Sequence, residues 1–280
     1  MPSSLRKRLF DTLDERVDRR VVAGLGSLFL SARSQSRCRV RYTEGHWVHR
    51  YPTGVVVNTT LGGLTARAQD QATRDLFLFD YQPQPGDTIF DVGAGVGSEV
   101  RLLSRLVGLA GRVVSIEAHP RTFACLRRTV ELNGLSNVTA LECAVVGDPG
   151  PVYLGDDRVD HIRNGLTGAA TGGVEVVGRT LGEIVRKLGV DRIDLLKMNI
   201  EGAELPVLEK SLDELAMVEN LVVSCHDFLS EPPYADGTDR AWQRTFGPVT
   251  ALLQDAGYTI RTRPQDPRPW VRHYVYASRP

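Results

Sequence analysis

A glycine-rich turn is the feature of this 280-residue chain that points most directly to chemistry. Residues 91–97 read Asp-Val-Gly-Ala-Gly-Val-Gly and directly follow the apolar run 88–90. Glycines let a backbone bend sharply and approach a ligand closely. Residues 98–107 then place apolar side chains on one helical face. The turn therefore joins a strand end to a helix start, where free N–H groups attract a carboxylate or phosphate. We predict that it binds a nucleotide-like cofactor.

The spacing and charge of this turn favour S-adenosylmethionine over a dinucleotide. Its glycines are spaced Gly-x-Gly-x-Gly, whereas dinucleotide-binding turns read Gly-x-Gly-x-x-Gly. Asp91 opens the turn. Its carboxylate would repel a pyrophosphate but can help hold the α-ammonium group of S-adenosylmethionine. An NAD-dependent oxidoreductase is a distant alternative.

Carboxylates at the next strand ends complete the predicted cofactor site. Glu117 ends the strand 112–117, where it can accept both hydroxyls of a ribose, although a solvated strand end is the alternative. Glu142 and Cys143 end a third strand, where an adenine edge would lie. The residues predicted to contact the cofactor are Asp91, Gly93, Ala94, Gly95, Gly97, Glu117, Ala118, Glu142, Cys143 and Ala144.

Two later strands bring candidate catalytic residues to the same rim, because ligands of parallel sheets bind beyond the carboxyl ends of the strands. The candidates are Lys197, Asn199 and Glu201 after the strand 193–198, and His226 and Asp227 after the strand 218–225. Methyl transfer to a hydroxyl needs alignment of the reacting atoms and removal of a proton.

His226 is the predicted general base, since an unperturbed histidine has a pKa of about 6.5, and Asp227 could orient it. A histidine that only caps the strand end is an equal alternative. Lys197 is predicted to orient the substrate or to pair with Glu201 or Glu204. Glu201 also begins a helix, where the dipole favours an acid without any catalytic role.

Three segments of the chain resemble the FkbM-type S-adenosylmethionine-dependent methyltransferases. They are residues 91–97, residues 114–120 with the sequence Val-Ser-Ile-Glu-Ala-His-Pro, and residues 193–204 with Ile-Asp-Leu-Leu-Lys-Met-Asn-Ile-Glu-Gly-Ala-Glu. The last is similar to the family's Asp-x-x-Lys-x-Asp-x-Glu-Gly-x-Glu signature. The resemblance spans roughly residues 87–227, about half of the chain.

The chain departs from that family at two positions. Asn199 stands where the family usually has Asp, and Gly182 stands where a Thr-Leu-Asp sequence usually ends. An amide keeps an acceptor oxygen but cannot act as a base or carry charge. A divalent metal held by Glu201, His226 and Asp227 is therefore conceivable but not favoured, and we predict no metal site.

Strands alternate with helices from residue 87 onward, which predicts an α/β fold with a doubly wound, mostly parallel sheet. The resemblance implies the Rossmann-like fold of class I methyltransferases. The last two strands, 258–263 and 271–277, are expected to form an antiparallel hairpin at the sheet edge. Residues 147–173 are expected to be a loop-rich insertion with at most a short hairpin.

The first third of the chain is predicted to be a separate segment. We divide the chain into residues 1–82, with an N-terminal helix and a small β/helical segment, and a methyltransferase domain, 83–280. An apolar residue recurs every fourth position at Leu5, Leu9, Leu13, Val17, Val21 and Leu25. This stripe predicts a helix that packs on the main domain, forms a homodimer or covers the active site. A basic membrane-surface helix is the alternative, which the interleaved acids weaken.

Net charge, cysteine spacing and the length of the apolar runs disfavour several classes of function and location. The formal net charge is zero, which disfavours nucleic acid as a partner. The four cysteines lie far apart without a Cys-x-x-Cys pair, which favours reduced thiols in a cytoplasmic protein. The apolar run 21–30 is too short to span a bilayer.

These observations predict an S-adenosylmethionine-dependent O-methyltransferase that acts on a hydroxyl of a small molecule, such as a sugar or a secondary metabolite in natural product biosynthesis. Two alternatives stay open. One is methylation of a carboxylate, which needs no base. The other is a cofactor-binding homologue without catalysis, for which Asn199 is the clue.

Overall fold

The computed structural model describes residues 17–155, 166–167, 173–232, 234 and 241–280. A seven-stranded sheet at its centre has the order β13-β14-β12-β11-β4-β5-β6. β14 runs antiparallel to both of its neighbours, and the other neighbouring pairs are parallel. The strands are β4 (Thr88–Val92), β5 (Arg112–Glu117), β6 (Val138–Glu142), β11 (Ile193–Met198), β12 (Val218–Ser224), β13 (Thr259–Arg261) and β14 (Tyr274–Ser278). The predicted doubly wound sheet and its antiparallel edge hairpin are confirmed.

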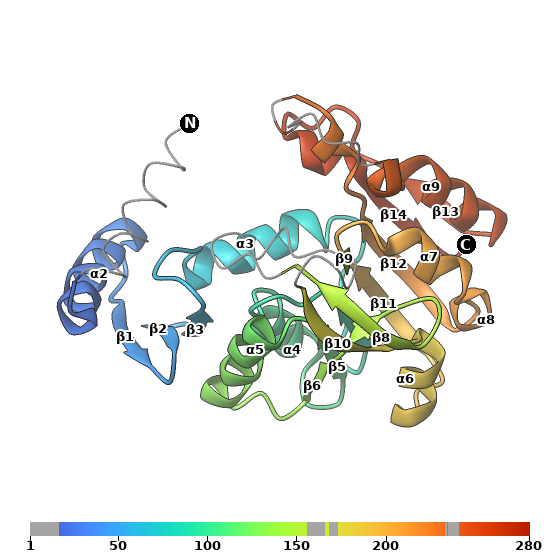
Figure 1. Cartoon of the computed structure of the whole chain (residues 1–280). Coiled ribbons are helices and arrows are strands. Elements are labelled where there is room, and N and C mark those ends of the chain that lie inside the picture. Colours follow the sequence, from blue (N-terminus) through green and yellow to red (C-terminus); the bar gives the residue numbers. More distant parts are fainter. Residues whose placement is uncertain (1–16, 156–165, 168–172, 233, 235–240) are drawn as a thin grey trace.

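Helices cover both faces of this sheet (Figure 1). One face carries α6 (Leu181–Leu188), α7 (Glu204–Glu209), α8 (Leu212–Leu215) and α9 (Phe246–Asp255). The other carries α4 (Val100–Val107), α5 (Pro120–Asn133) and the segment after α3 (Ala66–Leu76). Three 3-10 turns, η3 (Asp227–Ser230), η4 (Ala241–Gln243) and η5 (Pro269–His273), lie in the C-terminal part.

Side chains along the central strands alternate between the two cores. In β11, Leu196 and Met198 pack in the core beneath α6 and α7, whereas Leu195 packs in the core beneath α4. This period of two places Lys197 on the α4 face, and the same period in β4 places Asp91 there. The alternation therefore places the side chains of Lys197 and Asp91 in the interior, near the carboxyl ends of β11 and β4.

Strands β8 (Gly150–Leu154) and β9 (Leu166–Thr167) lie within the predicted insertion at 147–173 and pair antiparallel, as the short hairpin that the prediction allowed. They also join β7 (Ala144–Val145) and β10 (Val174–Arg179) in a second, four-stranded sheet, which was not predicted. β10 pairs parallel to β7 and antiparallel to β8. Short strands of this kind carry a weak pattern, and only their pairing defines the sheet.

A third sheet, β1-β2-β3, lies in the N-terminal segment: β1 (Arg39–Thr43), β2 (His46–Tyr51) and β3 (Gly54–Asn58). Helix α2 (Arg19–Ser34) packs on it, and Figure 1 shows both at the end of the molecule away from α9.

The apolar stripe predicted for the N-terminal helix is not its buried face. Val21 and Leu25 are exposed, whereas Val22, Gly26 and Leu30 face the β1–β3 sheet. Both sides of α2 carry apolar residues, and the side with Gly26 packs closely, since a Cβ there would lie 3.2 Å from a methyl carbon of Leu61. Leu5, Leu9 and Leu13 lie outside the described residues. The homodimer and lid roles stay predictions.

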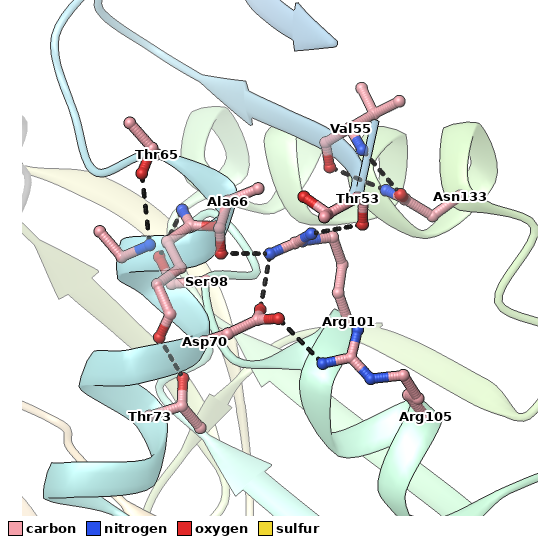
Figure 2. Close-up of polar contacts among 12 residues, drawn as sticks. Thr53, Val55, Thr65, Ala66, Asp70, Thr73, Ser98, Arg101, Arg105 and Asn133 are labelled. Atoms are coloured by element: carbon pink, nitrogen blue, oxygen red, sulfur yellow. Dashed lines mark hydrogen bonds and ion pairs between the residues drawn. The ribbon is translucent and has the colours of Figure 1, made fainter. Parts of the chain in front are cut away.

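Buried polar contacts join the N-terminal sheet to α4 and α5 (Figure 2). The Arg101 guanidinium donates to the Ala66 carbonyl at 2.9 Å, to the Thr53 carbonyl at 3.3 Å and to the Asp70 carboxylate at 2.8 Å. The side chain of Asn133 pairs with both the N–H and the carbonyl of Val55, each at 2.8 Å. Arg101 is 4% exposed, so these acceptors replace the water it would otherwise bind.

Candidate active site

The glycine turn lies against the end of β11, at the switch point of the sheet. The Asn199 N–H donates to the Val92 carbonyl at 3.0 Å, which holds the two strand ends together. Gly93 has φ +77°, and a Cβ there would come within 2.0 Å of the Asn199 carbonyl oxygen. Only glycine fits this position, because both the conformation and the close approach exclude a side chain.

A cavity of about 270 Å³ opens beside this turn. The predicted cofactor residues that line it are Gly93, Ala94, Gly95, Glu117, Ala118, Cys143 and Ala144. Of the predicted catalytic residues, Lys197, Asn199 and Glu201 line it. The predicted residues outside its lining are Asp91, Gly97, Glu142, His226 and Asp227. The structure therefore brings the turn, the end of β5 and the end of β11 together around one space.

Glu117 is fixed in this cavity by backbone donors. Its two carboxylate oxygens accept from the N–H groups of Gly95 and His119, each at 2.9 Å. Burial raises the pKa of Glu117, and these two donors act in the opposite direction. Each oxygen keeps acceptor capacity toward the cavity. Such a pre-oriented carboxylate suits a ligand that offers two neighbouring hydroxyls.

Glu142 occupies the matching position on the next strand, directly opposite Glu117 in the β5–β6 register. Its side chain is exposed and lies outside the cavity lining. The expectation that Glu142 contacts the cofactor is therefore not supported, although Cys143 and Ala144 do line the cavity.

Asp91 and Lys197 form a buried ion pair. They lie directly opposite each other in the β4–β11 register, and the Lys197 Nζ is 2.8 Å from Asp91 Oδ1. Their side chains are 0% and 2% exposed. The same ammonium donates to the Gly93 carbonyl at 2.8 Å and lies 4.9 Å from the centre of the Phe77 ring. Lys197 thus pairs with Asp91, not with the predicted Glu201 or Glu204, and supports the glycine turn from below.

The tight turn after β11 carries a further ionisable group of the cavity wall, Glu201. Glu201 has φ +57° and is followed by Gly202 with φ +101°. A left-handed conformation is costly for a glutamate and is retained where the surroundings impose it. Glu204 Oε1 accepts from the N–H groups of Ile200 and Gly202, both at 3.2 Å, and closes the turn. This backbone shape presents the Glu201 side chain to the cavity.

His226 lies behind Glu201, between two carboxylates. Its Nε2 is 3.3 Å from Glu201 Oε2, and its Nδ1 is 3.0 Å from Glu204 Oε1. Burial alone would lower the pKa of His226, but the two carboxylates outweigh it and raise the pKa to about 10. The imidazole therefore carries a proton at neutral pH. A protonated imidazole cannot accept another, so the geometry argues against His226 as the general base.

Asp227 does not orient His226 as predicted. Its Oδ2 accepts from the N–H groups of Thr245 and Phe246, both at 3.0 Å, at the start of α9. An acid at a helix N-terminus satisfies donors that the helix itself leaves free. Glu201 and Glu204 take the orienting role instead, because they flank the imidazole ring.

The charge on His226 has a consequence for stability. Its folded pKa of about 10 exceeds the unfolded value of about 6.5, so its contribution is fully present below pH 6.5 and is lost as pH rises toward 10. We expect the stability advantage of the natural protein over His226→Gln to shrink by a few kcal/mol across that interval. Urea unfolding at pH 6.5, 8 and 10 measures it.

His46→Gln is the matched control for that measurement. Burial lowers the pKa of His46, so it does not titrate between pH 6.5 and 10 and its variant should show no such trend. A pH-independent gap between the natural protein and His226→Gln would mean that His226 is neutral in the fold.

Several residues that line the cavity were not predicted from the sequence. They are Ser98, Glu99, His119, Thr122 and Leu154. Glu99 carried a usable signal, because it is an acid two residues beyond Gly97 and begins the helix that follows the turn. Leu154 carried none, since it comes from the second sheet.

Within the described ranges, no group of three or more His, Cys, Asp or Glu side chains could hold a metal ion. Among the helices of the described part, none is both long and apolar enough to cross a bilayer.

The sheet is parallel except for one reversed strand near its edge, a glycine turn follows its first strand, and an acid ends its second. This combination defines the class of S-adenosylmethionine-dependent methyltransferases. A sequence model of the methyltransferase FkbM domain matches residues 91–260. The chain belongs to the FkbM methyltransferase family.

Similar proteins include other methyltransferases. A protein-L-isoaspartate O-methyltransferase of Aeropyrum pernix is 40% identical over 86 residues, which is 31% of each chain. Methyltransferase 1 of Beauveria bassiana is 22% identical over 233 residues, covering 74% of this chain and 88% of that protein. The crystal structure of methyltransferase FkbM from Methylobacillus flagellatus is similar at a TM-score of 0.44 and 20% identity, over 69% of this chain and 43% of that one. The chain thus spans less than half of the first and third of these proteins.

Proposed function

We propose that this protein transfers the methyl group of S-adenosylmethionine to a hydroxyl of a small molecule, such as a sugar or a secondary metabolite. The observation that carries the proposal is Glu117, which lines the cavity and is held by the N–H groups of Gly95 and His119. Its free acceptor capacity fits the two ribose hydroxyls of the cofactor. Gly93 and Gly95 have no side chains, so the turn leaves room for the remaining parts of the cofactor.

When bound, the cofactor supplies an electrophilic methyl group, and its transfer to oxygen breaks the carbon–sulfur bond and leaves the electron pair on sulfur. The chain must then remove the hydroxyl proton. Glu201 is the group for this step, because it lines the cavity and His226 holds its carboxylate from behind. Asn199 lines the same wall and can hold the acceptor oxygen by its amide.

A row of aromatic side chains extends from His226, outside the cavity lining itself, and favours an acceptor with a flat or ring-shaped face. The ring of Phe228 lies 5.8 Å from His226 and 5.4 Å from Tyr234, and the ring of Tyr234 lies 6.3 Å from Trp270. All three rings are half-buried. Aromatic faces of this kind pack against sugars and planar metabolites and exclude water.

Methylation of a carboxylate is a second candidate, and one observation favours it. His226 is held as a cation, so the site contains no neutral imidazole at that position. A carboxylate acceptor is already ionised and needs no base. The relative from Aeropyrum pernix is named a protein-L-isoaspartate O-methyltransferase. The two candidates differ in whether turnover depends on Glu201.

Cofactor binding is the direct test. We expect isothermal titration calorimetry to show that S-adenosylmethionine and its demethylated product bind the natural protein. Glu117→Ala should weaken both by about tenfold to a hundredfold, because hydrogen bonds to a charged group are lost. Glu142→Ala is the matched control: it removes the exposed acid opposite Glu117 and should change neither affinity. No binding by either ligand at high micromolar concentration would refute the proposal.

A further inference from the structure

The cavity wall carries an excess of negative charge. Three carboxylates line it, those of Glu99, Glu117 and Glu201. Among the described lining residues Lys197 is the only Lys or Arg, and its ammonium already pairs with Asp91 at 2.8 Å. A ligand with positive groups is therefore favoured, since low-dielectric walls strengthen the attraction.

Glu99 forms no direct ion pair with a described side chain, although the Lys197 ammonium attracts its carboxylate. Glu117 accepts from two N–H groups, and Glu201 pairs with His226. The Glu99 carboxylate accepts a hydrogen bond from the backbone N–H of Glu99 itself. Burial raises the pKa of Glu99 to about 7, which the charge of Lys197 opposes and that of Asp91 reinforces. The ionised form of a half-buried acid with a raised pKa is one that a nearby cation would stabilise.

The backbone around Glu99 is anchored on both sides. Before it, the Ser98 hydroxyl is 3.4 Å from the Gln69 side-chain nitrogen of α3. After it, Arg101 is bound by Asp70 and by the Ala66 carbonyl (Figure 2). The start of α4 is thus fixed in place, which holds Glu99 at the cavity without a dedicated side-chain bond.

We propose that Glu99 holds the α-ammonium group of S-adenosylmethionine. The inference rests on the proposed function. Asp91 was expected to do this, but its carboxylate is 0% exposed and belongs to Lys197. With its ribose held by Glu117, the cofactor would extend its amino acid end along the glycine turn. Glu99 follows that turn in the chain and offers the free negative charge there. No bond forms or breaks in this step.

Three ligands separate this role from a general effect on the cavity. S-adenosylmethionine and S-adenosylhomocysteine carry the ammonium, whereas methylthioadenosine has the same adenosine and a thioether but no amino acid. We expect Glu99→Gln to weaken the first two by about tenfold to a hundredfold in calorimetry and to leave methylthioadenosine within about threefold. Glu117→Ala should weaken all three. Glu142→Gln, an exposed acid outside the lining, is the control and should weaken none.

A second readout follows from the titration of Glu99. The ionisable groups facing it are Asp91 on β4, Lys197 on β11 and Tyr274 on β14. An ammonium bound to Glu99 expels the proton that part of the molecules carry at pH 7. Titrations in buffers of different ionisation enthalpy should therefore show proton release with S-adenosylmethionine, but none with methylthioadenosine or with Glu99→Gln.

The outcomes distinguish the two levels of the hypothesis. If the natural protein binds none of the ligands, the proposed function fails. If it binds them and Glu99→Gln changes no affinity, or weakens methylthioadenosine equally, the ammonium role is overturned. Glu99→Asp keeps the charge on a shorter side chain and should bind S-adenosylmethionine more tightly than Glu99→Gln, whereas the reverse order would also overturn the role.

Discussion

Replacing Lys197 by Met is expected to lower the free energy of unfolding by about 3–5 kcal/mol, because it leaves a buried carboxylate without its partner. Asp91 is 0% exposed and the ammonium of Lys197 is 2.8 Å away. The side chain of Met is of similar length, so little volume is lost and the uncompensated charge dominates. Urea unfolding of the apoprotein at neutral pH measures the change.

A double variant isolates the pair. Lys197→Met combined with Asp91→Asn removes both charges and should be more stable than Lys197→Met alone, whereas independent residues would give additive losses. Lys210→Met is the matched control. Lys210 pairs with Asp148 at 3.3 Å, but their side chains are 57% and 81% exposed, so its loss should cost less than about 1 kcal/mol.

Glu201→Gln is expected to lower turnover with a hydroxyl acceptor by about 10²–10⁴-fold, because the amide cannot take the proton. The neutral side chain keeps the size of the original and can still bond to His226. The affinity for S-adenosylmethionine should stay within about threefold. Formation of the demethylated product, with sugars, phenols and carboxylic acids offered as acceptors, is the assay.

Glu209→Gln tests the same substitution on the exposed side of α7 and should leave turnover unchanged. If Glu201→Gln has nearly full turnover with a carboxylic acid acceptor, the second candidate function replaces the first. Full turnover with a hydroxyl acceptor would remove Glu201 from the chemistry altogether.

Local sequence signals predicted the fold well. The turn at 91–97, the strand ending in Glu117 and the hairpin at the edge are each encoded within a few residues, by glycines, apolar runs and turn residues. The apolar and helix-forming run 242–255, which by itself predicts one helix, shows the limit of such signals. Its first residues form the 3-10 turn η4, and α9 begins at Phe246, where Asp227 from a distant strand end caps it.

The ionic partners could not be predicted, because they depend on strand register and on turn geometry. Lys197 faces Asp91 only because β4 and β11, about a hundred residues apart, pair in one particular register. His226 receives two carboxylates because Glu201 adopts a left-handed conformation that turns its side chain back. A sequence shows which ionisable residues end the strands, but their pairing decides which carboxylates stay free for a ligand.

The hydrogen bonds from Arg101 to Thr53, Ala66 and Asp70 limit where this protein can be shortened. The FkbM match begins at residue 91, which invites trimming of everything ahead of it. Such a cut would remove Asp70 and the two carbonyls that bind the guanidinium, and it would expose to water the part of α4 that they cover. It would also remove Phe77, Leu78 and Ile89 from the core beneath α4 and the first residues of β4, so the leading segment is part of the scaffold.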